Sequence, residues 1–259
     1  MSTGPERIAA AFAGHGRAAA LMPYLMGGYP DVRASIDSAL AAAEAGADLI
    51  ELGIPFSDPL ADGPVIHSAG TEALRNGVTL EDVLGVAREA SAALPVVLMV
   101  YANPVLARGA ERFAEAAATA GAAGLIVPDL PYDEADAVRA ACEAAELALV
   151  PLVAPTTVEE RVAAIGRDAR GFVYTVSLAG TTGERDRLPP ELADTVARVR
   201  AATDVPVAVG FGISTAEHAR QVAELADGVI VGSRIVRAAG EGGADAVGAA
   251  VRELASGLE

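Results

Sequence analysis

The chain has 259 residues, 52% of them hydrophobic, which is enough apolar sequence for one large core. Its 35 acidic and 19 basic residues give a net charge of -16 at pH 7, which argues against a nucleic-acid partner because a phosphate backbone would be repelled. Every basic residue is arginine. Without lysine, the chain cannot be a Schiff-base aldolase, hold pyridoxal phosphate covalently or form a P-loop.

Two further features limit the class of protein. No apolar run approaches the ~20 residues of a membrane span, and no signal peptide is apparent, so we expect no membrane association. The single cysteine, Cys142, cannot form an internal disulfide, which predicts a reduced, cytoplasmic setting. The three histidines are scattered and show no metal-ligand spacing, so we expect no metal site.

Short apolar runs alternate with helical patterns along the whole chain. After an amphipathic segment of about 15 residues, the predicted strands are residues 20–26, 48–54, 96–101, 124–128, 148–153, 172–177, 207–211 and 228–232. The predicted helices are residues 32–45, 80–93, 110–120, 134–145, 158–165, 190–201, 216–225 and 245–254.

Eight strand-then-helix units in this length predict an α/β fold, a single (β/α)8 TIM barrel that forms one domain over residues 1–259. The first segment is expected to be an extra N-terminal helix that plugs the bottom of the barrel. An open doubly wound sheet is the alternative, but no G-x-G-x-x-G follows the first strand.

Acidic residues lie in and after the second predicted strand, where barrel enzymes place active-site groups. Glu51 stands in an apolar strand, so its side chain is expected at the barrel mouth, where loss of hydration raises the pKa of a carboxyl group and suits it to acid–base chemistry. A buried ion pair with an arginine is the alternative. In the stiff loop that follows, a turn-forming role is favoured for Asp58, while turn and active-site roles stay equally open for Asp62.

Small residues follow the seventh and eighth predicted strands, in GFGIS at residues 210–214 and VGSR at residues 231–234. Loops at these places often bind phosphate through backbone N–H groups near a helix N-terminus. The alternative, tight turns alone, explains one of these loops but less easily both.

The loop at residues 178–187 is a candidate lid or an ordinary surface loop. Tyr101 and Tyr174 could present hydroxyl groups inside the barrel or serve as core packing.

The string IELGIPFSDPLADGP at residues 50–64 resembles the signature of the tryptophan synthase alpha chain family. The resemblance extends over nearly the whole chain, through PY at 23–24, YANP at 101–104, VPDLP at 127–131, AGTTG at 179–183, GFGIS at 210–214 and GS at 232–233. The chain departs from common family patterns at Leu178 and in the MGGY segment at residues 26–29.

This resemblance implies a lyase, the alpha subunit of an enzyme of L-tryptophan biosynthesis. It would cleave indole-3-glycerol phosphate in a retro-aldol reaction to indole and D-glyceraldehyde 3-phosphate. The resemblance implies that Glu51 is the general acid–base, that Asp62 accepts the indole N–H hydrogen bond and that Tyr174 helps to position the site. It also implies substrate or phosphate contacts from Tyr24, Tyr101, Thr182, Gly183, Phe211, Gly212, Gly232 and Ser233.

The implied partner is a beta chain in an alpha2beta2 heterotetramer, which receives indole through a tunnel. Pyridoxal phosphate is expected in the beta chain and no cofactor in this one. We expect the partner to meet the loops near Asp58 and Asn103. A stand-alone lyase that releases free indole is an alternative. A non-catalytic barrel that activates a partner is another, although intact Glu51 and Asp62 speak against it.

Overall fold

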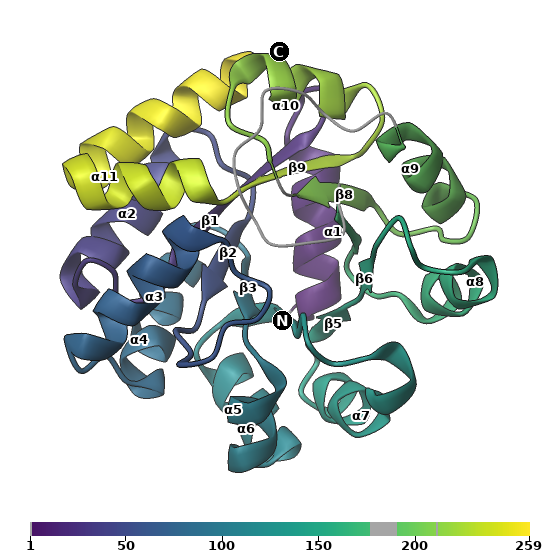
Figure 1. Ribbon diagram of the computed structural model, residues 1–259, viewed down its shortest axis with the longest axis horizontal. Helices are drawn as coiled ribbons and strands as arrows, with labels where there is room; N and C mark the ends of the chain where they lie inside the picture. Colours follow the sequence, from purple (N-terminus) through teal and green to yellow (C-terminus); the bar gives the residue numbers. More distant parts are fainter. Residues whose placement is uncertain (1, 177–190, 211) are drawn as a thin grey trace.

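The computed structural model describes residues 2–176, 191–210 and 212–259. In these residues, parallel strands form a ring with helices around it (Figure 1). The strands are β1 (Ala20–Met26), β2 (Ile50–Gly53), β3 (Val96–Met99), β4 (Ala122–Ile126), β5 (Ala148–Val150), β6 (Leu152–Val153), β7 (Val173–Val176), β8 (Val207–Gly210) and β9 (Gly228–Val231). Their spatial order is β5-β4-β3-β2-β1-β9-β8-β7-β6.

The two ends of this order, β5 and β6, are consecutive in the chain and separated by Pro151. Proline has no N–H group and interrupts a strand ladder. Its carbonyl still accepts a hydrogen bond of 2.9 Å from the Tyr174 N–H. Strands β5 and β6 therefore act as one strand of the barrel, in the place of the single strand predicted at residues 148–153. The predicted TIM-barrel fold is confirmed.

The extra N-terminal helix is also confirmed, as α1 (Gly4–Gly14). Thr3 and Glu6 form a capping box at its start, with reciprocal side-chain to backbone hydrogen bonds. Ile8 and Phe12 of this helix are buried in the same cluster as the inward side chains of the barrel, and the Phe12 ring lies 5.6 Å from that of Phe172. The apolar face of α1 thus closes one end of the barrel (Figure 1).

Most predicted helices are present with slightly different ends. They are α2 (Val32–Glu44), α4 (Leu80–Ser91), α6 (Ala110–Thr119), α7 (Asp136–Ala144), α8 (Glu159–Asp168), α9 (Leu192–Arg200) and α10 (Ala216–Ala223). A short 3-10 helix, η1 (Tyr132–Glu134), precedes α7. No helix in the described ranges is both long and apolar enough to cross a membrane.

Three helical segments were not predicted from the sequence: α3 (Pro64–Arg75), α5 (Ala102–Arg108) and the first part of α11 (Ser233–Ser256). Pro64 occupies the first turn of α3, where proline is favoured because the N–H it lacks would have no helical partner. In α11 the backbone kinks at Gly243, with φ 59° and ψ -147°. Proline and glycine, taken as loop signals, here begin or bend helices.

Candidate active site

Strand β2 places one carboxyl group inside the barrel. Side chains alternate along a strand, so Leu49 packs among the barrel interior while Ile50 and Leu52 pack toward the helices. Glu51 follows Leu49 by two positions and pairs in register with Tyr24 of β1. Glu51 is 2% exposed and lines the pocket inside the barrel.

The Glu51 carboxyl group is buried without compensation from the described residues. Its Oε1 atom has no hydrogen-bond partner there, and none of the ion pairs among them includes Glu51. The buried ion pair considered from the sequence is therefore not seen in this part of the chain. Burial, and then the charge of Asp62, raises the pKa of Glu51 from 4.5 to about 8. The group consequently holds a proton at neutral pH.

Asp62 has a different environment, because a tyrosine from the next strand fixes it. The Tyr101 hydroxyl, just after β3, donates a hydrogen bond of 2.9 Å to Asp62 Oδ1 and accepts one of 3.0 Å from the Ala61 N–H. The Phe56 ring stacks on Tyr101 with centroids 5.2 Å apart. Burial raises the pKa of Asp62, whereas the Tyr101 hydrogen bond and the nearby His67 lower it. The two carboxyl groups are thus held in contrasting surroundings, as acid–base pairs require.

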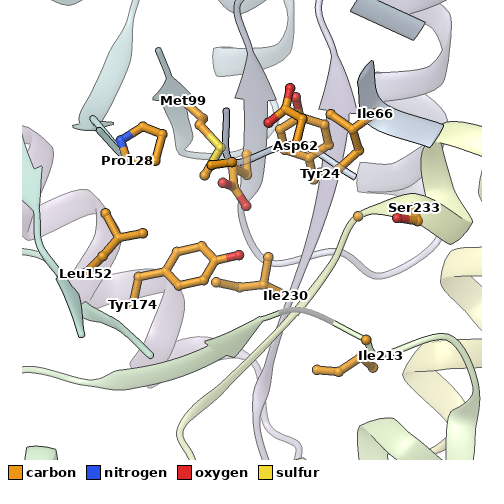
Figure 2. Close-up of a pocket in the computed structure, with 14 residues that line it drawn as sticks. Tyr24, Asp62, Ile66, Met99, Pro128, Leu152, Tyr174, Ile213, Ile230 and Ser233 are labelled. Atoms are coloured by element: carbon orange, nitrogen blue, oxygen red, sulfur yellow. The ribbon is translucent and has the colours of Figure 1, made fainter. Parts of the chain in front are cut away.

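Two tyrosines reach into the barrel over glycines of neighbouring strands. A Cβ atom on Gly53 would lie 1.9 Å from the Tyr24 hydroxyl, and one on Gly210 would lie 2.2 Å from the Tyr174 hydroxyl. Both glycines are therefore required for these rings to lie as they do. Tyr24 lies beside Asp62, and Tyr174 points its hydroxyl to the middle of the pocket from the other wall (Figure 2). Burial raises the pKa of both phenols well above the usual value, so both hydroxyls stay protonated.

A pocket lies at this layer of side chains, and Glu51, Asp62, Tyr24 and Tyr174 line it. Its polar groups are few, and most of its wall is apolar. The apolar wall residues are Ile66, Met99, Pro128, Leu152, Ile213 and Ile230. Such a combination is typical of small-molecule sites in which the apolar wall holds a ring and a few polar groups fix its orientation.

One edge of the pocket is suited to an anion. Gly212, Gly232 and Ser233 line it. Ser233 is the first residue of α11, so its N–H group and that of Arg234 precede the helical hydrogen bonds and have no helical acceptor. Gly212 has a φ of +84°, a conformation that favours glycine. The Arg234 side chain donates to the Ser214 carbonyl and so joins the two glycine-bearing loops.

The structure brings together most of the residues predicted for the site. Glu51, Asp62, Tyr24, Tyr174, Gly212, Gly232 and Ser233 line one pocket. Tyr101 is not among the lining residues and reaches the site through Asp62. Thr182, Gly183 and Phe211, with the candidate lid 178–187 that includes Leu178, lie outside the described residues.

Sequence reasoning placed Gly210 in the predicted phosphate loop but did not identify its role in making room for Tyr174, and it did not identify Gly53 or most of the apolar wall as parts of the site. Their positions at strand ends could have pointed to the two glycines, whereas Ile66 of the wall lies within α3. Within the described ranges, no group of three or more His, Cys, Asp or Glu side chains could hold a metal ion.

The fold and this pocket are those of a (β/α)8 barrel with a small-molecule site, in which two carboxyl groups face a largely apolar wall. Within that class, the chain belongs to the tryptophan synthase alpha chain family, whose sequence profile matches residues 11–257. Members of the family are enzyme subunits that cleave indole-3-glycerol phosphate, and the chain is a lyase of L-tryptophan biosynthesis.

Individual relatives agree with this assignment. The chain is 46% identical over 253 residues to the tryptophan synthase alpha chain of Synechococcus elongatus, covering 96% of this chain and 95% of the relative. It is 51% identical over 220 residues to that of Roseiflexus castenholzii, covering 84% of each. The structure is similar to Mycobacterium tuberculosis tryptophan synthase, with a TM-score of 0.91 at 44% identity over 97% of this chain and 98% of the other.

Proposed function

We propose that the pocket at the barrel mouth binds indole-3-glycerol phosphate and that Glu51 is its general acid–base. The observation that carries this proposal is the buried, unpartnered carboxyl group of Glu51, whose pKa of about 8 keeps it protonated at neutral pH. Its place in the wall of an apolar pocket matches a substrate with a flat aromatic ring.

The reaction then needs no lysine. Glu51 gives its proton to C3 of the indole ring, and the resulting cation accepts the electron pair of the breaking bond between C3 and the glycerol chain. The hydroxyl on the released carbon loses its proton to the Glu51 carboxylate and becomes the aldehyde of D-glyceraldehyde 3-phosphate. The protonated indole supplies the electron sink that a lysine imine provides in other aldol cleavages.

The other groups take the roles of orientation and charge stabilisation. The Asp62 carboxylate, held by Tyr101, accepts the indole N–H hydrogen bond and stabilises positive charge on the ring. Tyr174 positions the reacting groups from the opposite wall. The phosphate binds to the N–H groups at Gly212, Gly232 and Ser233. Contacts from Thr182, Gly183 and Phe211 stay predictions from the sequence.

We further propose a beta chain as partner in an alpha2beta2 assembly. A similar structure from Pyrococcus furiosus, with a TM-score of 0.86 and 38% identity over 93% of this chain and 98% of the other, is described as part of an a2b2 complex with mutual activation. Three exposed apolar side chains follow barrel strands: Leu60 after β2, Leu106 after β3 and Val158 after β6. They lie in segments at the same end of the barrel as the pocket, and Leu60 and Leu106 are close in sequence to Asp58 and Asn103. This is the surface on which we expect the beta chain to dock.

In this proposal pyridoxal phosphate is bound by the beta chain, because this chain has no lysine to hold it covalently. The stand-alone alternative is not favoured, since the relatives are alpha chains of a two-subunit synthase. A cytoplasmic setting stays a prediction from Cys142, whose side chain is buried.

Indole release from indole-3-glycerol phosphate tests the proposal, with and without a beta chain. We expect release by the chain alone and a faster rate in the complex. The Glu51→Gln variant should lose about 10²- to 10⁴-fold in kcat, the usual contribution of a general acid–base. Glu89→Gln, at an exposed position on α4, is the matched control. Equal rates for the wild type and Glu51→Gln would remove Glu51 from the mechanism.

A further inference from the structure

The Tyr24 hydroxyl is a buried donor without a strong acceptor. Its side chain is 4% exposed and lines the pocket. Its hydrogen-bond partner in the structure is the Met26 sulfur, at 4.0 Å. A thioether is a weak acceptor, whereas buried tyrosine hydroxyls ordinarily find a strong one. Because its acceptor is only a thioether sulfur, the Tyr24 hydroxyl can donate a hydrogen bond to an oxygen atom of a ligand in the pocket.

The position of this hydroxyl is built into the sheet. Tyr24 stands two residues before Met26, which pairs in register with Gly53, and the absence of a side chain on Gly53 makes room for the phenol. The same arrangement recurs across the barrel, where Tyr174 stands two residues before the partner of Gly210.

Packing alone would not require a hydroxyl on this ring. The ring packs in an apolar cluster with Met26, Ile66, Ala69 and Val236, a setting that a phenylalanine would fill equally well. The hydroxyl group is the part of Tyr24 that this apolar packing leaves unexplained.

Tyr24 also bridges the two polar regions of the pocket. Its Cβ atom lies 3.9 Å from the place a Cβ would take on Gly232, at the anion-binding edge. Its hydroxyl lies at Gly53, near the two carboxyl groups, whose charges help to raise its pKa in the order Asp62, then Glu51. No hydrogen bond joins Tyr24 to either carboxyl among the described residues, and Asp62 already accepts one from Tyr101. In a bound substrate, the three-carbon chain lies between the phosphate and the reacting carbon, which is the stretch that Tyr24 spans.

We propose that the Tyr24 hydroxyl donates a hydrogen bond to a hydroxyl oxygen of the glycerol chain, and that Tyr24 thereby selects a hydroxylated chain over a deoxygenated one. This inference rests on the proposed function, since it takes indole-3-glycerol phosphate as the ligand.

The test compares two ligands and two variants. Indole-3-propanol phosphate has the same ring and phosphate but lacks both glycerol hydroxyls. Tyr24→Phe removes only the phenol oxygen, and Tyr29→Phe makes the same change in a ring that lies against Gly240, outside the pocket. For Tyr24→Phe we expect kcat/KM on indole-3-glycerol phosphate to fall about five- to tenfold, the effect of one hydrogen bond. The inhibition constant of indole-3-propanol phosphate should stay within about twofold of the wild-type value, and the pH profile of kcat/KM should keep its shape.

Three results would overturn the inference. Unchanged kcat/KM would show that the hydroxyl contacts no substrate atom. Equal weakening of both ligands would show that the ring only shapes the pocket. A displaced pH profile would show that Tyr24 acts on a carboxyl group instead. Failure of the proposed function looks different, because the wild-type protein would then release no indole at all.

Discussion

Replacing Glu51 by glutamine should make the protein more stable in neutral and alkaline solution while it lowers kcat. The substitution keeps the shape of the side chain and removes its ability to ionise. In the folded protein Glu51 is 2% exposed, and its Oε1 has no partner among the described residues, so forming the carboxylate there is unfavourable. In the unfolded chain the same group is hydrated and ionises freely.

The magnitude follows from the two pKa values. The folded-state pKa of about 8 lies above the ordinary 4.5, so the folded protein keeps a proton that the unfolded chain has released between these pH values. The free energy of unfolding of the wild type therefore falls as the pH rises from about 4.5 to about 8, and then levels off. At about 1.4 kcal/mol per pH unit, the fall attributable to Glu51 is about 5 kcal/mol. Burial raises the pKa of Asp62 in both proteins, so its contribution cancels in the comparison.

Urea unfolding at pH 5, 7 and 9 measures this difference. We expect the free energy of unfolding of Glu51→Gln, relative to wild type, to increase from pH 5 to about pH 8 and to change little above that. The exposed Glu89→Gln variant should follow the wild type at every pH. Parallel curves for the wild type and Glu51→Gln would refute the reasoning, because they would mean that the carboxyl group ionises as easily in the folded protein as in the unfolded one.

Three further predictions concern the rest of the pocket. Tyr101→Phe removes the 2.9 Å hydrogen bond to Asp62 and should lower kcat about tenfold with the fold retained, as steady-state kinetics and circular dichroism would show. Gly210→Ala places a Cβ 2.2 Å from the Tyr174 hydroxyl and should reduce kcat/KM at least tenfold; a fully active variant would contradict the assigned ring position. Ser233→Asp puts a negative charge in the first turn of α11, so KM should rise more than about tenfold by repulsion of the phosphate, while the thermal midpoint stays the same or rises. A lowered midpoint with an unchanged KM would argue against a phosphate site there.

Much of the barrel followed from local patterns. Strands buried on both faces give short continuous apolar runs, and these runs located every barrel strand to within a few residues. The errors in the predicted helix and strand boundaries occurred at proline, which can begin a helix or interrupt a strand as well as mark a loop. Pro64 begins α3 although proline usually marks loops, and Pro151 divides one predicted strand into β5 and β6.

The candidate site was less accessible to sequence reasoning. Glu51 stood out because a charged residue in an apolar strand is unusual, whereas Asp62 depended on the resemblance of its loop to a known family. The apolar wall gave no signal, since Ile66, Met99 and Leu152 look like any core residues in the sequence. Which core positions face a pocket depends on how far the strands extend toward the barrel mouth.

The sequence by itself therefore determined the barrel, the inward direction of Glu51 and the absence of lysine chemistry, because periodicity and composition are local properties of the chain. Only the tertiary structure decided which groups act on one another. The bond between Tyr101 and Asp62 joins residues 39 positions apart, and the place of Tyr24 depends on a glycine in the neighbouring strand. Such contacts arise when the strands align in register, and no local pattern records them.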